Sequence, residues 1–249
     1  MKGILPFNTV KIKDKHLLSN KFGGWILLSD DEYQKVLLGK TEGELQNKLE
    51  ENKLIISESN AVQIKKDYNN ANKNLFNGTS LHIIAMSKGC NSRCVYCHSD
   101  SPYKKNINLK KENAIKILNH VFSSNAPSYT IEFQGGEALL NWENVKYVVQ
   151  EAETINKIEK KGLRFILCTN LTMMTDKHME FIKEHNIVVS TSLDGPENVH
   201  NANRQLLSGS GTYDKVVSWI KKLKNENVPV GALPTITKNT LNHGKELVD

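Results

Sequence analysis

Residues 81–97 read LHIIAMSKGCNSRCVYC, an apolar run followed by a polar loop that carries three cysteines. The run Leu81–Met86 has the length and apolar content of a buried strand. The loop after it places Cys90, Cys94 and Cys97 in a C-x3-C-x2-C spacing. In α/β folds, ligand sites lie in the loops at the carboxyl ends of strands. This stretch therefore predicts both a fold class and a place for its chemistry.

Downstream of this loop, strand-like and helix-like segments alternate to the end of the chain. Further apolar runs of strand length are Thr130–Gln134, Leu163–Thr169, Ile187–Ser192 and Val228–Thr237. Amphipathic helical stretches are Lys110–Phe122, Asn141–Ile158, Asp176–His185 and Tyr213–Asn225, and Leu241–Val248 is expected to begin another. Repeated βαβ units predict right-handed crossovers and a parallel sheet, arranged either as a barrel or as a doubly wound sheet.

Upstream, residues 1–56 are predicted to form a small α+β unit. Short apolar runs suggest strands near residues 10–12, 16–18 and 25–28, followed by two short helices. Each helix is expected to begin with a capping box, at Ser29–Glu32 and at Thr41–Glu44. Residues 57–79 are polar and rich in asparagine, which predicts a linker or a loose helix and places the domain boundary there.

Composition describes an ordinary globular chain. It has 249 residues, 39% hydrophobic and 24% charged, and a formal net charge of +6. No apolar run reaches the roughly 18 residues that a membrane span needs, and the start of the chain lacks a signal-peptide apolar region, so a cytoplasmic protein is expected. The lysines are scattered rather than clustered with aromatics, which disfavours nucleic-acid binding. Four cysteines in such a chain indicate metal or redox chemistry more than disulfides.

Three thiolates in one short loop can hold three irons of a [4Fe-4S] cluster and leave the fourth iron open. The alternative is a structural zinc site of Cys90, Cys94, Cys97 and His98. Structural zinc normally joins two separated pairs of ligands, and His98 directly follows Cys97. The spacing therefore favours the cluster, with zinc as the rival interpretation.

Other polar motifs at strand ends are weak signals by themselves. Gly135-Gly136-Glu137 ends one predicted strand, where glycines permit close backbone approach. Asp194-Gly195-Pro196 is typical of a turn. Cys168, within an apolar run, is expected to be a buried structural thiol.

With the motif C-x3-C-x-Tyr-x-C after the first strand, the chain resembles the radical S-adenosylmethionine (radical SAM) superfamily, which implies a (β/α)6 barrel. The resemblance implies that Cys90, Cys94 and Cys97 hold a [4Fe-4S] cluster and that Tyr96 lies beside the adenine of SAM. In that family, one electron from the cluster splits SAM into methionine and a 5′-deoxyadenosyl radical. About five β/α units are present between residues 80 and 249, so a partial barrel is expected.

The resemblance extends to the other strand-end motifs. Gly135, Gly136 and Glu137 match the motif that holds the amino group of SAM, with Ala138 in place of the usual proline. Ser192 matches a serine that meets the ribose, and Arg204 an arginine that pairs with the carboxylate of SAM. Leu171 follows Thr169-Asn170 where the family usually has glycine.

Within the superfamily, the chain resembles the branch of peptide and sulfatase maturases through the motifs Ser190–Pro196 and His200–Arg204. It also resembles the maturase of His-Xaa-Ser repeat peptide systems, through Leu5–Asn8, Ser80–Ile83, Thr130–Glu137, Thr169–Leu171 and Ser190–Pro196. This similarity implies hydrogen abstraction from a ribosomally made peptide, with an electron donor such as flavodoxin or ferredoxin. Residues 1–56 are expected to help recognise the peptide. A radical SAM oxidoreductase that acts on a Cys or Ser of a sulfatase-like protein is the second hypothesis. A zinc-bearing or cluster-bearing binding module without turnover is the third.

The sequence identifies no general acid, general base or radical relay residue. Family barrels usually have six units, and this branch usually adds a cysteine-rich domain. Outside the loop, only Cys168 remains. The chain is therefore expected to be a carboxyl-terminally truncated piece, or a short member that a partner chain completes.

Overall fold

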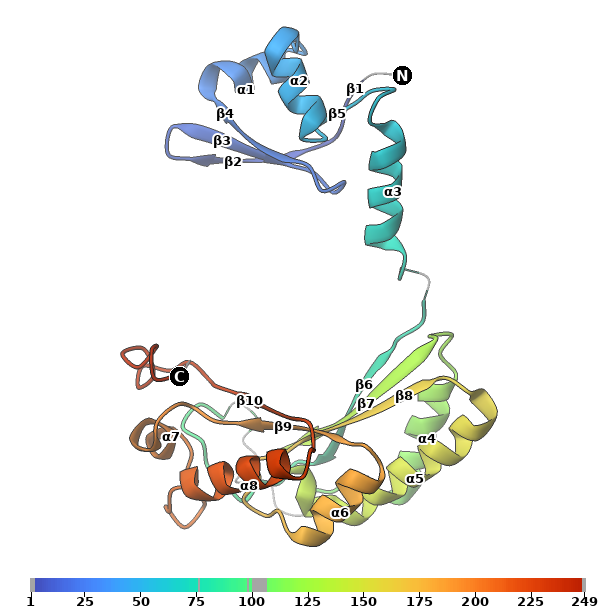
Figure 1. The fold of residues 1–249 in the computed structure, drawn as a ribbon, viewed down its shortest axis with the longest axis vertical. Coiled ribbons are helices and arrows are strands. Elements are labelled where there is room, and N and C mark those ends of the chain that lie inside the picture. Colours follow the sequence, from blue (N-terminus) through green and yellow to red (C-terminus); the bar gives the residue numbers. More distant parts are fainter. Residues whose placement is uncertain (1–2, 76, 98, 100–106, 248–249) are drawn as a thin grey trace. The chain divides into compact units, whose positions relative to one another are not determined.

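A computed structural model of the chain describes residues 3–75, 77–97, 99 and 107–247. The chain divides into two compact units, Met1–Phe76 and Asn77–Asp249 (Figure 1). Each unit has its own cluster of buried apolar side chains. In the described part of the chain, no helix combines the length and the hydrophobicity that crossing a bilayer requires.

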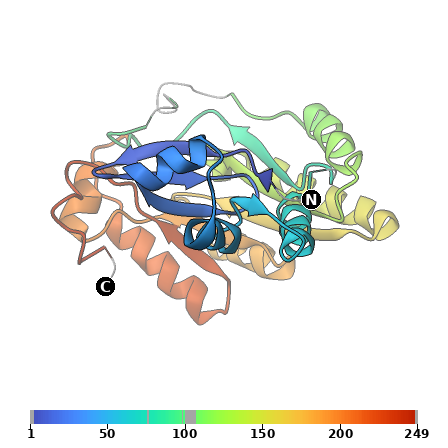
Figure 2. The same ribbon diagram turned by 90° about the horizontal axis from the view of Figure 1, so that it is seen from above.

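The first unit is a small α+β fold. Its elements are β1 (Gly3–Ile4), β2 (Asn8–Ile12), β3 (Lys15–Ser19), β4 (Trp25–Ser29), α1 (Asp30–Leu37), α2 (Gly43–Glu51), β5 (Ile55–Ile56) and α3 (Ala61–Asn72). Strands β2, β3 and β4 run side by side as an antiparallel sheet (Figure 2), and β1 pairs with β5. Leu18 and Leu28 from the sheet and Leu49 from α2 are almost fully buried in the core of this unit.

The two helix starts expected in this unit have different outcomes. The capping box at Ser29 is confirmed: the Ser29 side chain accepts from the backbone N–H of Glu32, and the Glu32 carboxylate accepts from the backbone N–H of Ser29. The box at Thr41 is wrong, because Glu42 is the N-cap of α2 and no side chain caps this helix. Gly43 has a φ of +59°, and this left-handed turn separates Thr41 from the helix axis.

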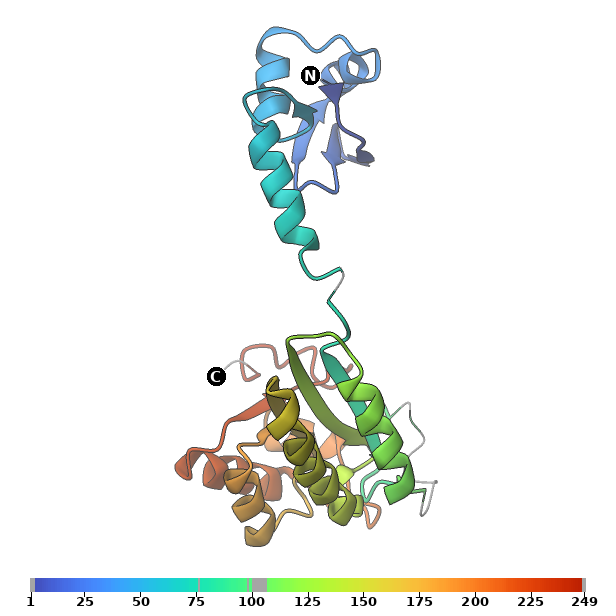
Figure 3. The ribbon, with the colours of Figure 1, turned by 90° about the vertical axis from the view of Figure 1, so that its right-hand side faces the viewer.

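Helix α3 occupies most of the polar stretch for which a linker was one expectation (Figure 3). Ile64 is 3% exposed, and the Tyr68 ring lies 5.3 Å from the ring of Phe22. The Lys53 ammonium and the Asp67 carboxylate form an ion pair at 2.5 Å. One face of α3 therefore packs on the first unit, and its asparagine-rich composition belongs to the exposed face.

The second unit alternates strands and helices. Its elements are β6 (Leu81–Ser87), α4 (Lys111–Phe122), β7 (Ser128–Gly135), the 3-10 turn η2 (Ala138–Asn141), α5 (Trp142–Glu159), β8 (Gly162–Cys168), α6 (Asp176–Glu184), β9 (Val188–Ser192), α7 (Glu197–Asn203), α8 (Tyr213–Asn225) and β10 (Val230–Leu233). The described strands form a five-stranded sheet in the order β10-β9-β8-β7-β6, parallel at every pairing.

The strand order decides between the two arrangements left open by the sequence. Successive strands are neighbours throughout and the order never reverses, as in a barrel and not as in a doubly wound sheet. Helices α4, α5, α6 and α8 cover one face of the sheet (Figure 1), where Ile131, Phe133 and Leu167 are fully buried. The chain thus forms an α/β fold with part of a (β/α) barrel.

Two expectations at the end of the chain are wrong. Strand β10 ends at Leu233, earlier than expected, because Pro234 has no N–H with which to continue the ladder. The segment 241–247 forms turns instead of the start of a helix, and Val248 lies outside the described residues. Gly244 disfavours a helix there, and Leu241 is 67% exposed, so no packing compensates.

Helix α7 and the turn η2 were not expected from the periodicity. Both are shorter than the window over which a helical pattern is readable. Both also follow a strand directly, so they shape the loops at the carboxyl edge of the sheet.

Candidate cofactor site

The cysteine loop leaves the carboxyl end of β6 and is held by backbone hydrogen bonds. Arg93 N–H donates to the carbonyl of Gln205 at 2.8 Å, and Val95 N–H donates to the carbonyl of Asn203 at 2.9 Å. Leu207 N–H donates to the carbonyl of Asn91 at 3.1 Å. The segment after α7 therefore pairs with the loop and fixes its shape.

The three cysteine residues of this loop face one cavity of about 410 Å³. Its lining comes from the ends of several strands and comprises Cys90, Ser92, Cys94, Tyr96, Cys97, Ser99, Gly135, Gly136, Asn170, Ser192, Arg204 and Thr235. Eight of the nine residues predicted from the sequence are in this list, and Glu137 is not. Distant segments of the chain meet here because parallel strands end at the same edge of a sheet.

The thiols are half-buried, which disfavours their deprotonated forms. Burial raises the pKa of Cys90 to about 11 and also raises the pKa of Cys94, which the Arg204 guanidinium opposes. Cys90 and Cys94 are therefore protonated at neutral pH in the absence of metal, and binding of iron would displace these protons.

The donor set, three thiols from one short loop that face one cavity, fits a [4Fe-4S] cluster. In the described part of the chain, no three His, Cys, Asp or Glu side chains lie close enough together to hold one metal ion. A [4Fe-4S] cluster separates its cysteine sulfurs more widely, because each sulfur binds a different iron. His98, the fourth ligand of the zinc alternative, lies outside the described residues.

Gly135 brings the end of β7 against the end of β6. Its φ is +140°, and a Cβ there would lie 2.2 Å from the carbonyl oxygen of Ser87. Gly136 N–H donates to that same carbonyl at 2.8 Å. This close approach explains why glycine is required and leaves bare backbone on the cavity wall.

The Glu137 carboxylate lies behind the cavity wall. Its Oε1 accepts from the Thr169 hydroxyl at 2.7 Å and from the Leu139 N–H at 3.0 Å, and its Oε2 accepts from the Asn170 N–H at 2.8 Å. The residue is 1% exposed, and burial raises the pKa of this carboxyl. Glu137 therefore joins the end of β7 to the end of β8 and supports Asn170.

Asn170 lies between β8 and the cysteine loop. Its amide donates to Asn91 Oδ1 at 2.8 Å and to Ser92 Oγ at 3.3 Å, and it points at Cys90 Sγ at 3.8 Å. The next residue, Leu171, has a φ of +59° and is fully buried. The turn thus keeps the left-handed conformation for which glycine is suited, and core packing of the leucine side chain offsets the strain.

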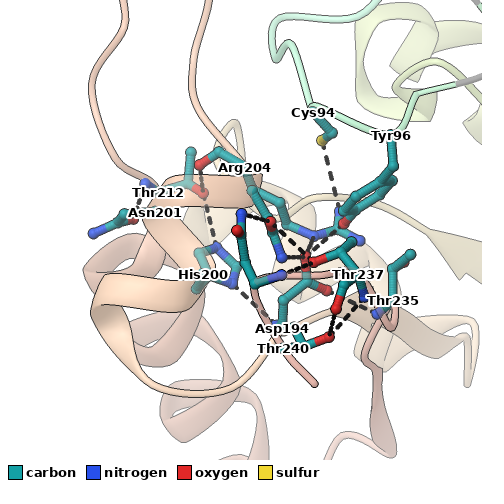
Figure 4. A network of polar contacts seen from close by, with 12 residues as sticks. Cys94, Tyr96, Asp194, His200, Asn201, Arg204, Thr212, Thr235, Thr237 and Thr240 are labelled. Atoms are coloured by element: carbon teal, nitrogen blue, oxygen red, sulfur yellow. Dashed lines mark hydrogen bonds and ion pairs between the residues drawn. The ribbon is translucent and has the colours of Figure 1, made fainter. Parts of the chain in front are cut away.

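Asp194 is the centre of a polar network on the other side of the cavity (Figure 4). Its Oδ2 accepts from the Tyr96 hydroxyl at 2.6 Å and from Arg204 Nε at 3.0 Å, and its Oδ1 accepts from the Thr235 N–H at 2.9 Å. Burial and this carboxylate both raise the pKa of Tyr96. The sequence assigned Asp194 to a turn and so missed this role. The sequence signal that could have revealed this role is the position of Asp194, just after the end of β9 and ten residues before Arg204.

Cys168 does not line the cavity. It lies on β8, where its thiol donates to the Glu132 carboxylate at 3.4 Å, and burial raises its pKa to about 12. A thiol with so high a pKa is a poor ligand and a poor nucleophile at neutral pH.

Comparison with known proteins agrees with this geometry. The family model of the radical SAM superfamily matches residues 84–249. The cysteine-type anaerobic sulfatase-maturating enzyme of Clostridium perfringens (strain 13 / Type A) is 29% identical over 171 residues, which are 66% of this chain and 46% of that enzyme. The chain therefore spans about half the length of this relative.

Solved structures give the same assignment. Native anSMEcpe with bound AdoMet is 28% identical, superposes with a TM-score of 0.62 and covers 68% of this chain and 47% of that one. Native anSMEcpe with bound AdoMet and Kp18Cys peptide is 27% identical, with the same TM-score, and covers 68% of this chain and 46% of that one. Streptococcus suis SuiB, at 17% identity, shares the fold over 98% of this chain and 57% of its own, with a TM-score of 0.52. The chain belongs to the radical SAM superfamily, whose members use a [4Fe-4S] cluster and S-adenosylmethionine.

Proposed function

We propose that this chain binds a [4Fe-4S] cluster and S-adenosylmethionine and acts on a ribosomally made peptide. The observation that carries the proposal is the convergence of Cys90, Cys94 and Cys97 with Tyr96 and Arg204 on one cavity. When bound, the two cofactors supply a 5′-deoxyadenosyl radical that abstracts a hydrogen atom. The chain itself would bind and orient the two cofactors and shield the radical from water.

Each cavity residue has a role that follows from its chemistry. The three thiolates hold the cluster, and Arg204, with donors left over from its contact with Asp194, suits the SAM carboxylate. The Ser192 hydroxyl suits the ribose and the Tyr96 ring suits the adenine.

On the opposite wall, the bare backbone at Gly135 and Gly136 lets the amino group of SAM approach closely. Glu137 serves this site from behind the wall, by holding Asn170 and the strand ends in place.

A peptide substrate is favoured by the relatives. Two matched structures hold a peptide as well as AdoMet, and several matched relatives are sulfatase-maturating enzymes. The His-Xaa-Ser peptide assignment is the narrower form of this proposal. The net charge of +6 suits an acidic one-electron donor such as flavodoxin or ferredoxin.

The first unit is proposed to recognise the peptide. Val10 (54% exposed), Trp25 (62%) and Leu27 (45%) lie on one face of its three-stranded sheet. Within the described residues, β2 pairs only with β3, so one of its edges has unpaired backbone groups. An extended peptide could add to that edge through main-chain hydrogen bonds.

The second candidate is oxidation of a Cys or Ser in a sulfatase-like protein, which the name of the Clostridium perfringens relative favours. Capture of partners on the holoenzyme, followed by mass mapping of the modified residue, separates the two. Modification of a short ribosomal peptide supports the first, and modification of a folded sulfatase supports the second.

Anaerobic reconstitution tests the proposal. We expect about four irons per chain and release of 5′-deoxyadenosine when SAM and a reductant are added. Cys94→Ala should lose the cluster, whereas Cys168→Ala, outside the cavity lining, should retain it. Bound zinc without SAM cleavage would show a binding module and contradict the proposal.

A further inference from the structure

Asp194 is fully buried, and its carboxylate accepts four hydrogen bonds beside the cavity. Besides Tyr96, Arg204 and the Thr235 N–H, its Oδ2 accepts from the Asn203 amide at 3.4 Å. Three of these four donors share Oδ2 and the fourth reaches Oδ1, so both oxygens of the carboxylate are engaged by groups of the chain itself. Asp194 also does not line the cavity.

Asp194 and Tyr96 contact the Arg204 guanidinium on two sides. Its Nε donates to Asp194 at 3.0 Å, and its guanidinium carbon lies 5.2 Å from the centre of the Tyr96 ring. Its Nη1 is 3.9 Å from Cys94 Sγ. Among the described residues, Asp194 is the one carboxylate paired with Arg204, and it occupies only the Nε edge.

Arg204 also lines the cavity, and its Nη1 faces Cys94 of the cysteine loop (Figure 4). A free arginine side chain samples many rotamers, and ordering it on binding costs affinity. Here that ordering is already present, because Asp194 fixes one edge and Tyr96 one face.

We propose that Asp194 is a positioning residue that aims the Arg204 guanidinium at the carboxylate of the SAM methionine moiety. The inference rests on the proposed function. It adds that the preference for SAM over a ligand without the carboxylate depends on Asp194, which does not line the cavity. Tyr96 links the same carboxylate to the cysteine loop, so assembly of the loop and aiming of Arg204 are coupled.

The test compares two ligands on the oxidised, reconstituted holoenzyme, which binds without turnover. Equilibrium dialysis measures the affinities for SAM and for decarboxylated SAM, which lacks the carboxylate. In Asp194→Asn, which has nearly the same shape, we expect the preference for SAM to fall by about tenfold or more. Iron content and affinity for decarboxylated SAM should stay close to those of the wild type.

Two further variants keep the test decisive. Asp176→Asn makes the same chemical change on an exposed side chain and should leave the preference unchanged. Arg204→Ala should lose the preference as Asp194→Asn does, and the double variant should lose little more.

A purely structural role would weaken both ligands by the same factor in Asp194→Asn, and that result would overturn the inference. Should Asp194→Asn not fold, a full preference for SAM in Arg204→Ala would overturn it as well. A wild-type chain that holds no cluster or binds no SAM would instead refute the proposed function, and the two failures are thus distinguishable.

Discussion

At the scale of single residues, His200 shows how one buried side chain fixes the site. Asp194 N–H donates to His200 Nδ1 at 3.2 Å, so Nδ1 carries no proton. His200 Nε2–H then donates to the Thr212 hydroxyl at 2.9 Å, and that hydroxyl donates to the Arg204 carbonyl at 3.1 Å. Only the neutral imidazole satisfies this chain of bonds. Burial, followed by the charge of Arg204, lowers the pKa of His200 to about 4.

This lowered pKa predicts a loss of stability in acid. Above pH 6.5, His200 is neutral in both the folded and the unfolded chain, so it does not change the free energy of unfolding. Below pH 6.5, the unfolded chain binds a proton at His200 that the folded chain does not bind. Stability should therefore fall as the pH drops from 6.5 toward 4, by about 1 kcal/mol at pH 5.5. Urea unfolding of the wild type and of His200→Gln at pH 7.5 and 5.5 measures it. Equal pH dependence of the two proteins would contradict the assignment.

Gly135 permits a second prediction at this scale. Gly135→Ala places a Cβ against the Ser87 carbonyl at 2.2 Å and strains a φ of +140°. We expect a loss of more than about 2 kcal/mol in unfolding free energy. Gly231→Ala is the matched control, because a Cβ there meets no atom within 4 Å. Similar losses in the two variants would show that clash at Ser87 is not the cause.

At the scale of elements, local capping and core packing decide where the helices begin. Helix α1 starts at a reciprocal capping box, whereas α2 starts without any side-chain cap. Helix α2 persists because Leu45 and Leu49 are buried in the core of the first unit. A capping motif therefore identified one helix start, and apolar packing determined the other.

Ser29→Ala should cost about 1 kcal/mol in unfolding of the first unit, because the Glu32 N–H loses its acceptor. Thr41→Ala should change stability by less than about 0.5 kcal/mol, since Thr41 caps nothing. Chemical unfolding followed by amide exchange in α1 and α2 measures both. A larger effect at Thr41 than at Ser29 would reverse our assignment of the caps.

At the scale of the whole molecule, the residues that the structure describes form two hydrophobic cores, one within each unit. Leu18, Leu28 and Leu49 belong to one, and Phe133 and Val148 belong to the other. Because each core is closed within its own unit, each unit has its own source of cooperativity.

Leu49→Ala should destabilise the first unit by about 2–5 kcal/mol through loss of burial and a residual cavity. Amide exchange should quicken in α1, α2 and β3 and stay unchanged in β7 and β8. Val148→Ala should give the opposite pattern. Loss of protection in both units from either substitution would show a single cooperative fold.

The sequence by itself determined the α/β alternation of the second unit, the cysteine loop and most of the cavity lining. These depend on local information: apolar periodicity sets the strands and helices, and motifs at strand ends share one edge of a parallel sheet. The match of Tyr213–Asn225 to α8 and the meeting of Cys90, Gly135 and Ser192 in one cavity show how far such information reaches.

Only the tertiary structure revealed the features of the fold and the site that depend on contacts between residues far apart in the sequence. It showed that the strands follow the order of a barrel and not that of a doubly wound sheet. It also placed Glu137 behind the cavity wall and showed that Asp194 is the centre of a hydrogen-bond network and not only a turn residue. The hydrogen bond from Tyr96 to Asp194 joins residues 98 positions apart, and no local pattern encodes it. Periodicity specifies which face of an element is buried, but the partners of a buried carboxylate are known only once the chain is folded.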